Sequence, residues 1–142
     1  MKLESQVVSL DLAKRLKELG VKQESYAYWQ FVIDKWQLTT SADYAYLNSP
    51  SQAGWESYSA FTVAELLDLL PPWIIDERTN INPHPFCMLT LIETEKDLWT
   101  CKYLDHDDNY SLHSEYGCTE ATSALAKMVI YLLENKLVQL PA

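Results

Sequence analysis

The chain has 142 residues, of which 48% are hydrophobic and 22% are charged, so its length and composition predict one globular domain over residues 1–142 and exclude a disordered or low-complexity protein. Its formal net charge is −9, with 20 acidic residues against 11 basic ones. Because direct binding to a phosphate backbone needs a basic face, and Lys14, Arg15 and Lys17 form the largest basic cluster, direct nucleic-acid binding is not expected.

The first predicted element is a helix over residues 10–19. Ser9 suits the N-cap position, and leucines recur on one face at helical spacing. Gly20 follows as the C′ residue that ends many helices. The next segment, SYAYWQFVIDKW (25–36), alternates and is rich in aromatic and β-branched side chains, which predicts a strand. YAYL (44–47) is expected as a second short strand within a polar connection.

The second predicted helix has the clearest start signal in the chain. In FTVAELLDLLPP, Thr62 as N-cap and Glu65 at N3 form a capping box. Phe61 and Leu66 fall at the two positions of a hydrophobic staple. Proline cannot continue a helix, so this helix is predicted to end before Pro71.

Two strands, FCMLTLIET (86–94) and LWTCKYL (98–104), are predicted to pair as a hairpin. A two-residue turn at 95–96 places Ile92 opposite Trp99. In that register both faces are apolar, which predicts a central hairpin covered on both sides, at least in part. One face then holds Met88, Ile92, Trp99, Cys101 and Tyr103, and the other holds Leu89, Leu91, Leu98 and Leu104.

A third strand, YSLHSEY (110–116), is expected to extend the meander, and a last helix follows over residues 120–135 with Thr119 as N-cap. Its buried stripe is predicted to hold Ala121, Leu125, Met128, Val129 and Leu132. The resulting order is α-β(β)-α-β-β-β-α. Runs of strands, rather than strict alternation with helices, favour an α+β fold in which an antiparallel sheet, a meander of about four to five strands, packs with three helices.

Three segments of the chain resemble a family of small uncharacterised bacteriophage and prophage-type proteins. They are SLDLAKRLKELGVKQESYAYW, SAFTVAELLDLLP and ALAKMVIYLLENKL. The resemblance implies a phage-type protein in the cytoplasm of the host cell. The family has no established activity, so no catalytic residue can be carried over from it. Inhibitors of host defence proteins occur among small acidic phage proteins, which is an analogy of class.

No targeting or membrane segment is expected. The opening MKLESQVVSL lacks the apolar region of a signal peptide, and no run approaches the apolar length of a membrane span. The three cysteines are scattered without a C-x-x-C pair, so free thiols in a reducing cytoplasm are expected. We therefore expect a cytoplasmic protein with no membrane contact and no cofactor.

The segment LDHDDNYSLH (104–113) concentrates groups that are able to hold a metal ion. Asp105, Asp107 and Asn109 have the 1, 3, 5 spacing that opens an EF-hand calcium loop. Such a loop also needs glycine at position six and glutamate at position twelve, where this chain has tyrosines. The pattern therefore favours a polar turn between two strands.

Zinc is the other metal hypothesis, because four possible ligands occur in order: Cys101, His106, His113 and Cys118. Their spacing matches no zinc module. With a two-residue turn at Asp107–Asp108, Cys101 faces Ser114 and His113 faces Lys102, so the cysteine and the histidine lie on opposite faces. A three-residue loop would bring them together. The cysteines are then interpreted as small buried residues. No metal site is assigned, and the candidate ligands are Cys101, Asp105, His106, Asp107, His113 and Cys118.

Nucleophilic catalysis would need a thiolate activated by a nearby base. Cys87 follows His84 by three residues, and Cys118 lies just before the last predicted helix. Neither cysteine is accompanied by a glycine-rich oxyanion loop, a G-x-S-x-G elbow or a nucleotide-binding motif. We therefore assign no catalytic residue; a non-enzymatic protein is favoured, and an enzyme stays open as an alternative.

Aromatic residues in the long polar connection are the candidate binding residues: Tyr44, Tyr46, Trp55 and Tyr58. Tyrosine and tryptophan among small polar neighbours are typical of adaptable binding surfaces. The alternative is that these side chains fold back and cover the sheet.

Three functional hypotheses follow. The first is a phage-type binding or regulatory protein that engages a protein partner through the aromatic loop or its acidic surface. The second is an acidic inhibitor of a host nucleic-acid-binding or defence protein. The third is a metal-dependent enzyme built on residues 101–118. A homodimer is also plausible, because the predicted hairpin is apolar on both faces.

Overall fold

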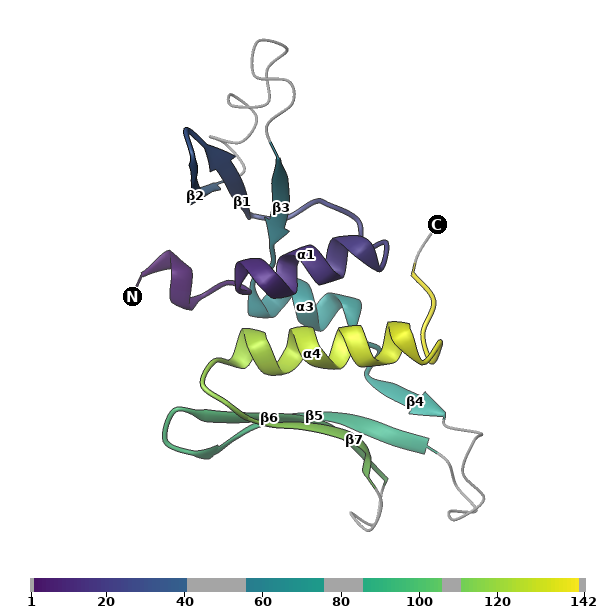
Figure 1. The fold of residues 1–142 in the computed structure, drawn as a ribbon. Helices are drawn as coiled ribbons and strands as arrows, with labels where there is room; N and C mark the ends of the chain where they lie inside the picture. The colour runs from purple at the N-terminus through teal and green to yellow at the C-terminus, as the bar shows by residue number, and fades with distance from the viewer. Residues whose placement is uncertain (1, 41–55, 76–85, 106–110, 141–142) are drawn as a thin grey trace.

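The computed structural model describes residues 2–40, 56–75, 86–105 and 111–140 (Figure 1). Within these ranges the chain forms three α-helices and two antiparallel sheets, which confirms the α+β class. In order, the elements are η1 (Leu3–Ser5), α1 (Leu10–Glu18), β1 (Ala27–Val32), β2 (Lys35–Thr40), β3 (Ser57–Ala60), α3 (Val63–Leu69), β4 (Trp73–Ile75), β5 (Phe86–Glu95), β6 (Leu98–Asp105), β7 (Ser111–Cys118) and α4 (Ala121–Glu134).

Helix α4 occupies the middle of the fold (Figure 1). The four-stranded sheet covers one side of it, and α1 and α3 cover the other. Because neighbours pack on both sides, the buried surface of α4 is wider than one stripe. Its buried residues are Thr122, Ala124, Leu125, Ala126, Met128, Val129 and Leu132. Four of the five predicted stripe residues are among them, and Ala121 is half-buried.

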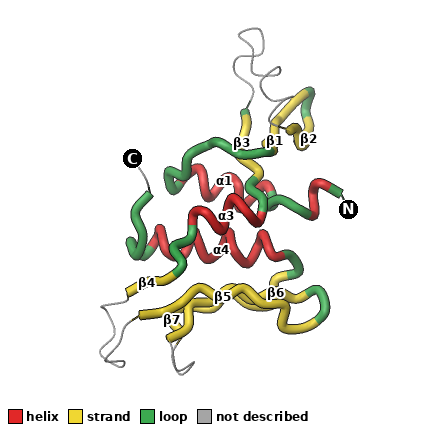
Figure 2. Tube along the Cα trace, turned by 180° about the vertical axis from the view of Figure 1, so that it is seen from behind, coloured by secondary structure: helices red, strands yellow, loops and turns green. Residues whose placement is uncertain are grey.

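The strands divide into two sheets, whereas a single sheet was predicted. β4, β5, β6 and β7 form a four-stranded meander, and β2, β1 and β3 form a second, three-stranded sheet. The second sheet lies on the far side of α1 from α4 (Figures 1 and 2). The segment predicted as one strand over residues 25–36 folds back as the β1–β2 hairpin, with Ile33 and Asp34 in its turn. The predicted strand at 44–47 lies outside the described residues.

Two helix ends follow the sequence signals closely. The Ser9 side chain accepts a hydrogen bond from the Leu12 N–H, which confirms the N-cap of α1. Gly20 has φ +90°, and the Val21 N–H donates to the Leu16 carbonyl at 3.1 Å. This bond and the positive φ define a Schellman ending, for which glycine is favoured because it has no Cβ.

Helix α3 has the predicted capping box, formed by the Thr62 and Glu65 side chains. Phe61 and Leu66 are both buried in the core, as a staple pair requires. Helix α4 differs from the prediction, because its N-cap is Glu120 and not Thr119. Thr122 Oγ1 donates to the Val7 carbonyl at 3.3 Å, so tertiary packing helps to fix where this helix begins.

The predicted register of the β5–β6 hairpin is wrong. Its turn lies at Lys96–Asp97, and Trp99 pairs with Glu93 instead of Ile92. A bulge follows Glu93, and Asp97 adopts φ 62° while its N–H donates to Glu93 Oε1 at 2.9 Å. The turn lies one residue later than predicted, which in a regular ladder would pair Trp99 with Thr94, and the bulge shifts that pairing by one residue to Glu93.

The corrected register changes which residues share a face. Leu89 pairs with Tyr103 and Leu91 pairs with Cys101, so these four lie on the face that packs against α4. On the other face Ile92 is 39% exposed, with Lys102 half-buried nearby. The described helices cover one face of this sheet only (Figure 1). On the other face Thr100 is nevertheless buried, so the expectation that both faces are covered at least in part stays a prediction.

Candidate binding surface

The predicted metal ligands do not form a described cluster. Cys101 in β6 and Cys118 in β7 are both buried in the core, which confirms their interpretation as small buried residues. His106 and Asp107 lie outside the described residues, and for Asp105 and His113 the description extends only to the backbone of β6 and β7. Among the described side chains, no group of three or more His, Cys, Asp and Glu residues is placed to hold a metal ion.

The register around the cysteines also differs from the prediction. Cys101 pairs with Glu115, and Lys102 pairs with Ser114, the residue after His113. Leu104 still pairs with Ser111, as a turn at 107–108 requires, and the irregular pairing between Lys102 and Leu104 then shifts the ladder by one residue before Cys101. Burial, followed by the nearby Glu115 and Cys118 charges, raises the pKa of Cys101 to about 12. At neutral pH this thiol is protonated and a poor nucleophile.

Tyr58 is the one predicted binding residue within the described part of the chain, since Tyr44, Tyr46 and Trp55 lie outside it. It sits in β3 opposite Trp29 and is half-buried. Its hydroxyl donates to the Glu56 carboxylate, and this bond is the main reason why the pKa of Tyr58 is raised. Tyr58 is therefore partly covered in the structure, and its binding role stays a prediction.

Tyr58 belongs to a larger apolar surface that we call the aromatic end, formed by Phe31, Ile33, Trp36 and Tyr58. The ring centroids of Phe31 and Trp36 are 5.3 Å apart, and those of Trp36 and Tyr58 are 5.7 Å apart. Phe31 is 38% exposed and Ile33 is 87% exposed. Phe31, Ile33 and Trp36 were not predicted as binding residues. The sequence prediction placed residues 25–36 in one strand, which separates Trp36 from Phe31.

Two lysines of α1 extend over this aromatic cluster. The Lys14 amine lies 5.0 Å from the centre of the Trp36 ring, and the Lys17 amine lies 5.0 Å from the centre of the Tyr58 ring. Lys17 Nζ also donates to the Ser57 carbonyl at 3.2 Å. These cation–π contacts hold positive charge beside the aromatic end of an otherwise acidic chain.

The turn of the β1–β2 hairpin is strained. Ile33 has φ 50° and Asp34 has φ 61°, the left-handed values of a type I′ turn. This conformation costs an L-residue about 1–2 kcal/mol, and it is a clear outlier for a β-branched residue such as isoleucine. Asparagine or glycine would avoid most of that cost and would also not expose an apolar side chain.

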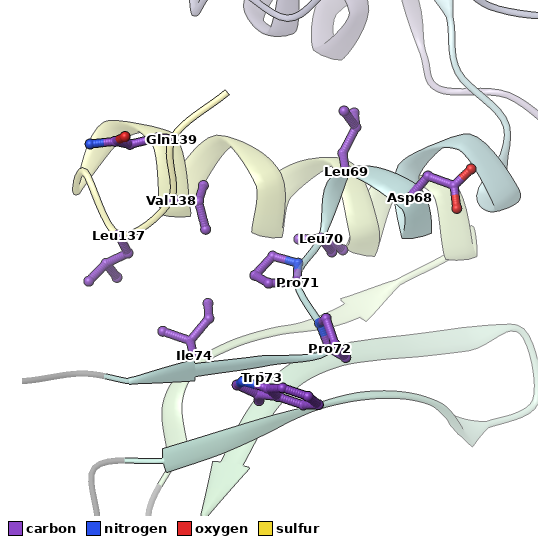
Figure 3. Close-up of a pocket in the computed structure, with 10 residues that line it drawn as sticks. All are labelled: Asp68, Leu69, Leu70, Pro71, Pro72, Trp73, Ile74, Leu137, Val138 and Gln139. Carbon is purple, nitrogen blue, oxygen red and sulfur yellow. The ribbon is translucent and has the colours of Figure 1, made fainter. Parts of the chain in front are cut away.

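A pocket of about 620 Å³ lies between the end of α3 and the C-terminal segment (Figure 3). Eight of its ten lining residues are apolar, and Trp73 is 55% exposed. Asp68 is the single carboxylate among the lining residues, which include no histidine or cysteine. The pocket therefore lacks a nucleophile and base pair within the described lining. The residues are Asp68, Leu69, Leu70, Pro71, Pro72, Trp73, Ile74, Leu137, Val138 and Gln139.

A second hollow, which we call the acidic groove, has a volume of about 720 Å³. It lies where η1, the beginnings of α3 and α4, and the β5–β6 hairpin meet. Its apolar lining includes Val63, Leu91 and Trp99, and its charged lining residues are Asp97 and Glu120. The remaining lining residues are Ser5, Gln6, Thr62, Ala64, Thr119 and Ala121.

Comparisons of the chain with protein-family models, with curated proteins and with solved structures gave no match. The resemblance to phage-type proteins therefore stays a prediction. Within the described part of the chain, no helix has the length and apolar character needed to cross a membrane.

Proposed function

We propose that the protein is a non-enzymatic binding or regulatory protein of phage type, which acts in the host cytoplasm by docking its aromatic end onto a protein partner. The observation that carries this proposal is Ile33. Its side chain is 87% exposed, and its backbone has a left-handed φ of 50°. Both features lower the stability of the free protein, and residues that would avoid them are common in hairpin turns.

The surroundings of Ile33 support the same proposal. Phe31 adds exposed apolar surface on the same hairpin, and Trp36 and Tyr58 provide rigid aromatic area beside it. Aromatic side chains are enriched at protein interfaces, and tryptophan and tyrosine are among the residues that contribute most of the binding energy there. The two described pocket linings include no histidine or cysteine.

The test is affinity capture with a matched pair of variants. The immobilised protein is incubated with bacterial lysate. The proteins that it captures are compared between wild type and the double variant Phe31→Ser, Ile33→Asn. The control is Ile92→Ser, because Ile92 on the four-stranded sheet is 39% exposed and Phe31 is 38% exposed. We expect a specific captured protein to be lost with the double variant and retained with the control. An identical set of captured proteins for all three would contradict the proposal.

A second candidate function rests on the net charge of −9. An acidic chain of this kind is suited to occupy the basic, nucleic-acid-binding groove of a host or defence protein. Binding of that type weakens steeply with added salt, because it depends on exposed charges. Docking through the apolar aromatic end would be far less sensitive, so the salt dependence of capture separates the two candidates.

A further inference from the structure

The acidic groove combines an apolar wall with carboxylates that have no counter-ion among the described residues. We propose that it is a binding site for a small amphipathic organic cation, a molecule with an apolar or aromatic body and an amine or guanidinium group. The groove is separate from the aromatic end, so this inference goes beyond the function proposed above and does not depend on it.

Segments from distant parts of the chain form the groove on one side of the molecule. η1, the beginning of α4 and the turn of the β5–β6 hairpin lie on this side in both views (Figures 1 and 2). The two helix starts contribute small side chains, Ala64 and Ala121, whose size helps to keep the groove open. Its volume of about 720 Å³ is within the range of roughly 300–1,000 Å³ that is typical of small-molecule sites.

The apolar wall is suited to the body of such a ligand. Val63, Leu91 and Trp99 line the groove, and each of them is half-buried, so part of its surface stays in contact with water. A ligand that covers this surface removes it from water, which favours binding. An indole ring attracts cations more strongly than other aromatic side chains do, so Trp99 suits a ligand that also carries positive charge.

The carboxylates of Asp97 and Glu120 are suited to the charged group of the ligand. Within the described part of the chain, neither carboxylate takes part in an ion pair or a hydrogen bond. Their backbones have defined positions: the Asp97 N–H donates to Glu93 Oε1 at 2.9 Å in the hairpin turn, and Glu120 is the N-cap of α4. An amine or guanidinium group donates strong, charge-assisted hydrogen bonds to carboxylates of this kind.

The charges around the groove also favour a cation. On the adjoining β5–β6 hairpin, two carboxylates, Glu93 and Glu95, outnumber Lys96. Next to Ser5 on the η1 side, Lys2 and Glu4 offset each other. The local field therefore has the same sign as the net charge of the chain, and it attracts positively charged ligands.

The helix starts are the part of the groove that favours an anion. In α3 the capping box already occupies the N–H groups of Thr62 and Glu65. Helix α4 has no side-chain cap, so its positive end is available to negative charge. That end is equivalent to about half an elementary charge, whereas Asp97 and Glu120 carry one full negative charge each. The balance therefore favours a cation.

The test is an NMR titration of the isotope-labelled protein with three probes of similar size and different charge. They are phenethylamine, phenethyl alcohol and phenylpropionate. The indole N–H signal of Trp99, assigned with the variant Trp99→Phe, reports on the groove. We expect phenethylamine to shift this signal saturably, phenethyl alcohol to bind more weakly, and phenylpropionate to bind least.

Matched variants test the roles of the carboxylates. Asp97→Asn and Glu120→Gln each remove one charge with little change in shape, and asparagine also tolerates the φ of 62° at position 97. Each is expected to weaken phenethylamine binding about two- to five-fold, as for an exposed ion pair. The two together are expected to abolish the preference for the amine over the alcohol. Glu95→Gln is the control, because Glu95 is exposed on the same hairpin and does not line the groove.

Three results would overturn the inference. The first is no saturable shift with any probe, and the second is equal binding of the amine and the alcohol by wild type. The third is tighter binding of phenylpropionate, which would assign the groove to anions at the start of α4. The double variant Phe31→Ser, Ile33→Asn is expected to bind phenethylamine like wild type, so failure here and failure of the capture experiment are distinguishable.

A second copy of the chain is the other occupant that the experiment checks. Sedimentation velocity is measured for wild type and for Ala64→Arg, which fills the groove from an exposed position. Self-association of wild type that Ala64→Arg removes would assign the groove to a second copy and overturn the inference. We expect instead that Ala64→Arg abolishes phenethylamine binding and leaves the sedimentation coefficient unchanged.

Discussion

Phe31 and Trp36 lie directly opposite each other across the β1–β2 hairpin, with ring centroids 5.3 Å apart. They are close because the chain reverses between them in a two-residue turn formed by Ile33 and Asp34. The strained turn and the aromatic pair therefore depend on each other. The turn brings the rings together, and the rings help to hold the hairpin closed around a turn that its sequence does not favour.

This relationship predicts that Ile33→Asn stabilises the protein. Asparagine tolerates a left-handed φ, so the substitution is expected to raise the free energy of unfolding by about 1 kcal/mol. It also removes an apolar side chain that is 87% exposed. The measurement is urea unfolding followed by circular dichroism at a protein concentration low enough to keep the chain monomeric.

The control for this prediction is Asp34→Gly, which relieves the other left-handed residue of the turn and leaves the Ile33 side chain in place. Both variants are expected to stabilise the fold, but only Ile33→Asn is expected to lose binding. A fall in the free energy of unfolding for Ile33→Asn would show that the Ile33 side chain supports the fold, and the binding role would then lose its main support.

The Glu65 carboxylate is predicted to be a critical polar group at the start of α3. It accepts hydrogen bonds from the Thr62 N–H at 2.8 Å and from the Tyr26 N–H at 2.6 Å. Glu65→Ala leaves both donors unpaired and is expected to lower the free energy of unfolding by about 1–2 kcal/mol. Asp68→Ala in the same helix is the control, since its side chain is exposed. Equal effects of the two substitutions would contradict this role for Glu65.

The capping box at the start of α3 shows why part of the fold could be predicted from the sequence. Thr62 and Glu65 act on backbone groups within one helical turn, so their roles depend only on local spacing. The same is true of Ser9 and Gly20 at the two ends of α1. Register depends on bulges and turn geometry, and for that reason the pairing of Trp99 with Glu93 was missed.

The candidate site was harder to predict for a related reason. The aromatic end depends on Ile33 adopting a backbone conformation that isoleucine rarely adopts, so turn preferences argued against a hairpin there. Once the hairpin forms, Trp36 and Tyr58 meet although they are far apart in the sequence. Functional sites are expected where a residue departs from its preferred backbone conformation, as Ile33 does.

Alkaline pH is predicted to destabilise the protein through Cys101 and Tyr103. Burial raises the pKa of Cys101 from its ordinary 9.0 to about 12, and burial also raises the pKa of Tyr103 above its ordinary 10.0. Both groups keep their protons longer in the folded state than in the unfolded state. Their contribution is therefore complete below about pH 9 and is lost as the pH rises toward 12.

The measurement is the free energy of unfolding as a function of pH for wild type and for Cys101→Ala. The variant is expected to be less stable at neutral pH, because it loses buried volume, but to show a shallower decline above pH 9. Parallel declines for the two proteins would contradict the assignment. Tyr103→Phe provides a second variant, in which the Pro71 carbonyl loses a hydrogen bond of 2.7 Å.

The hydroxyl of Ser59 is predicted to lower the stability of the fold. Ser59 in β3 is fully buried, and among the described residues neither its Oγ atom nor the Nε2 atom of Gln30 on the neighbouring strand has a hydrogen-bond partner. A buried polar group without a partner costs about 1–3 kcal/mol, so Ser59→Ala is expected to raise the free energy of unfolding by about 1 kcal/mol. Ser57→Ala on the same strand is the control, because Ser57 is half-buried and its hydroxyl is not among the unpaired buried atoms. A loss of stability with Ser59→Ala would show that this hydroxyl is hydrogen-bonded in solution.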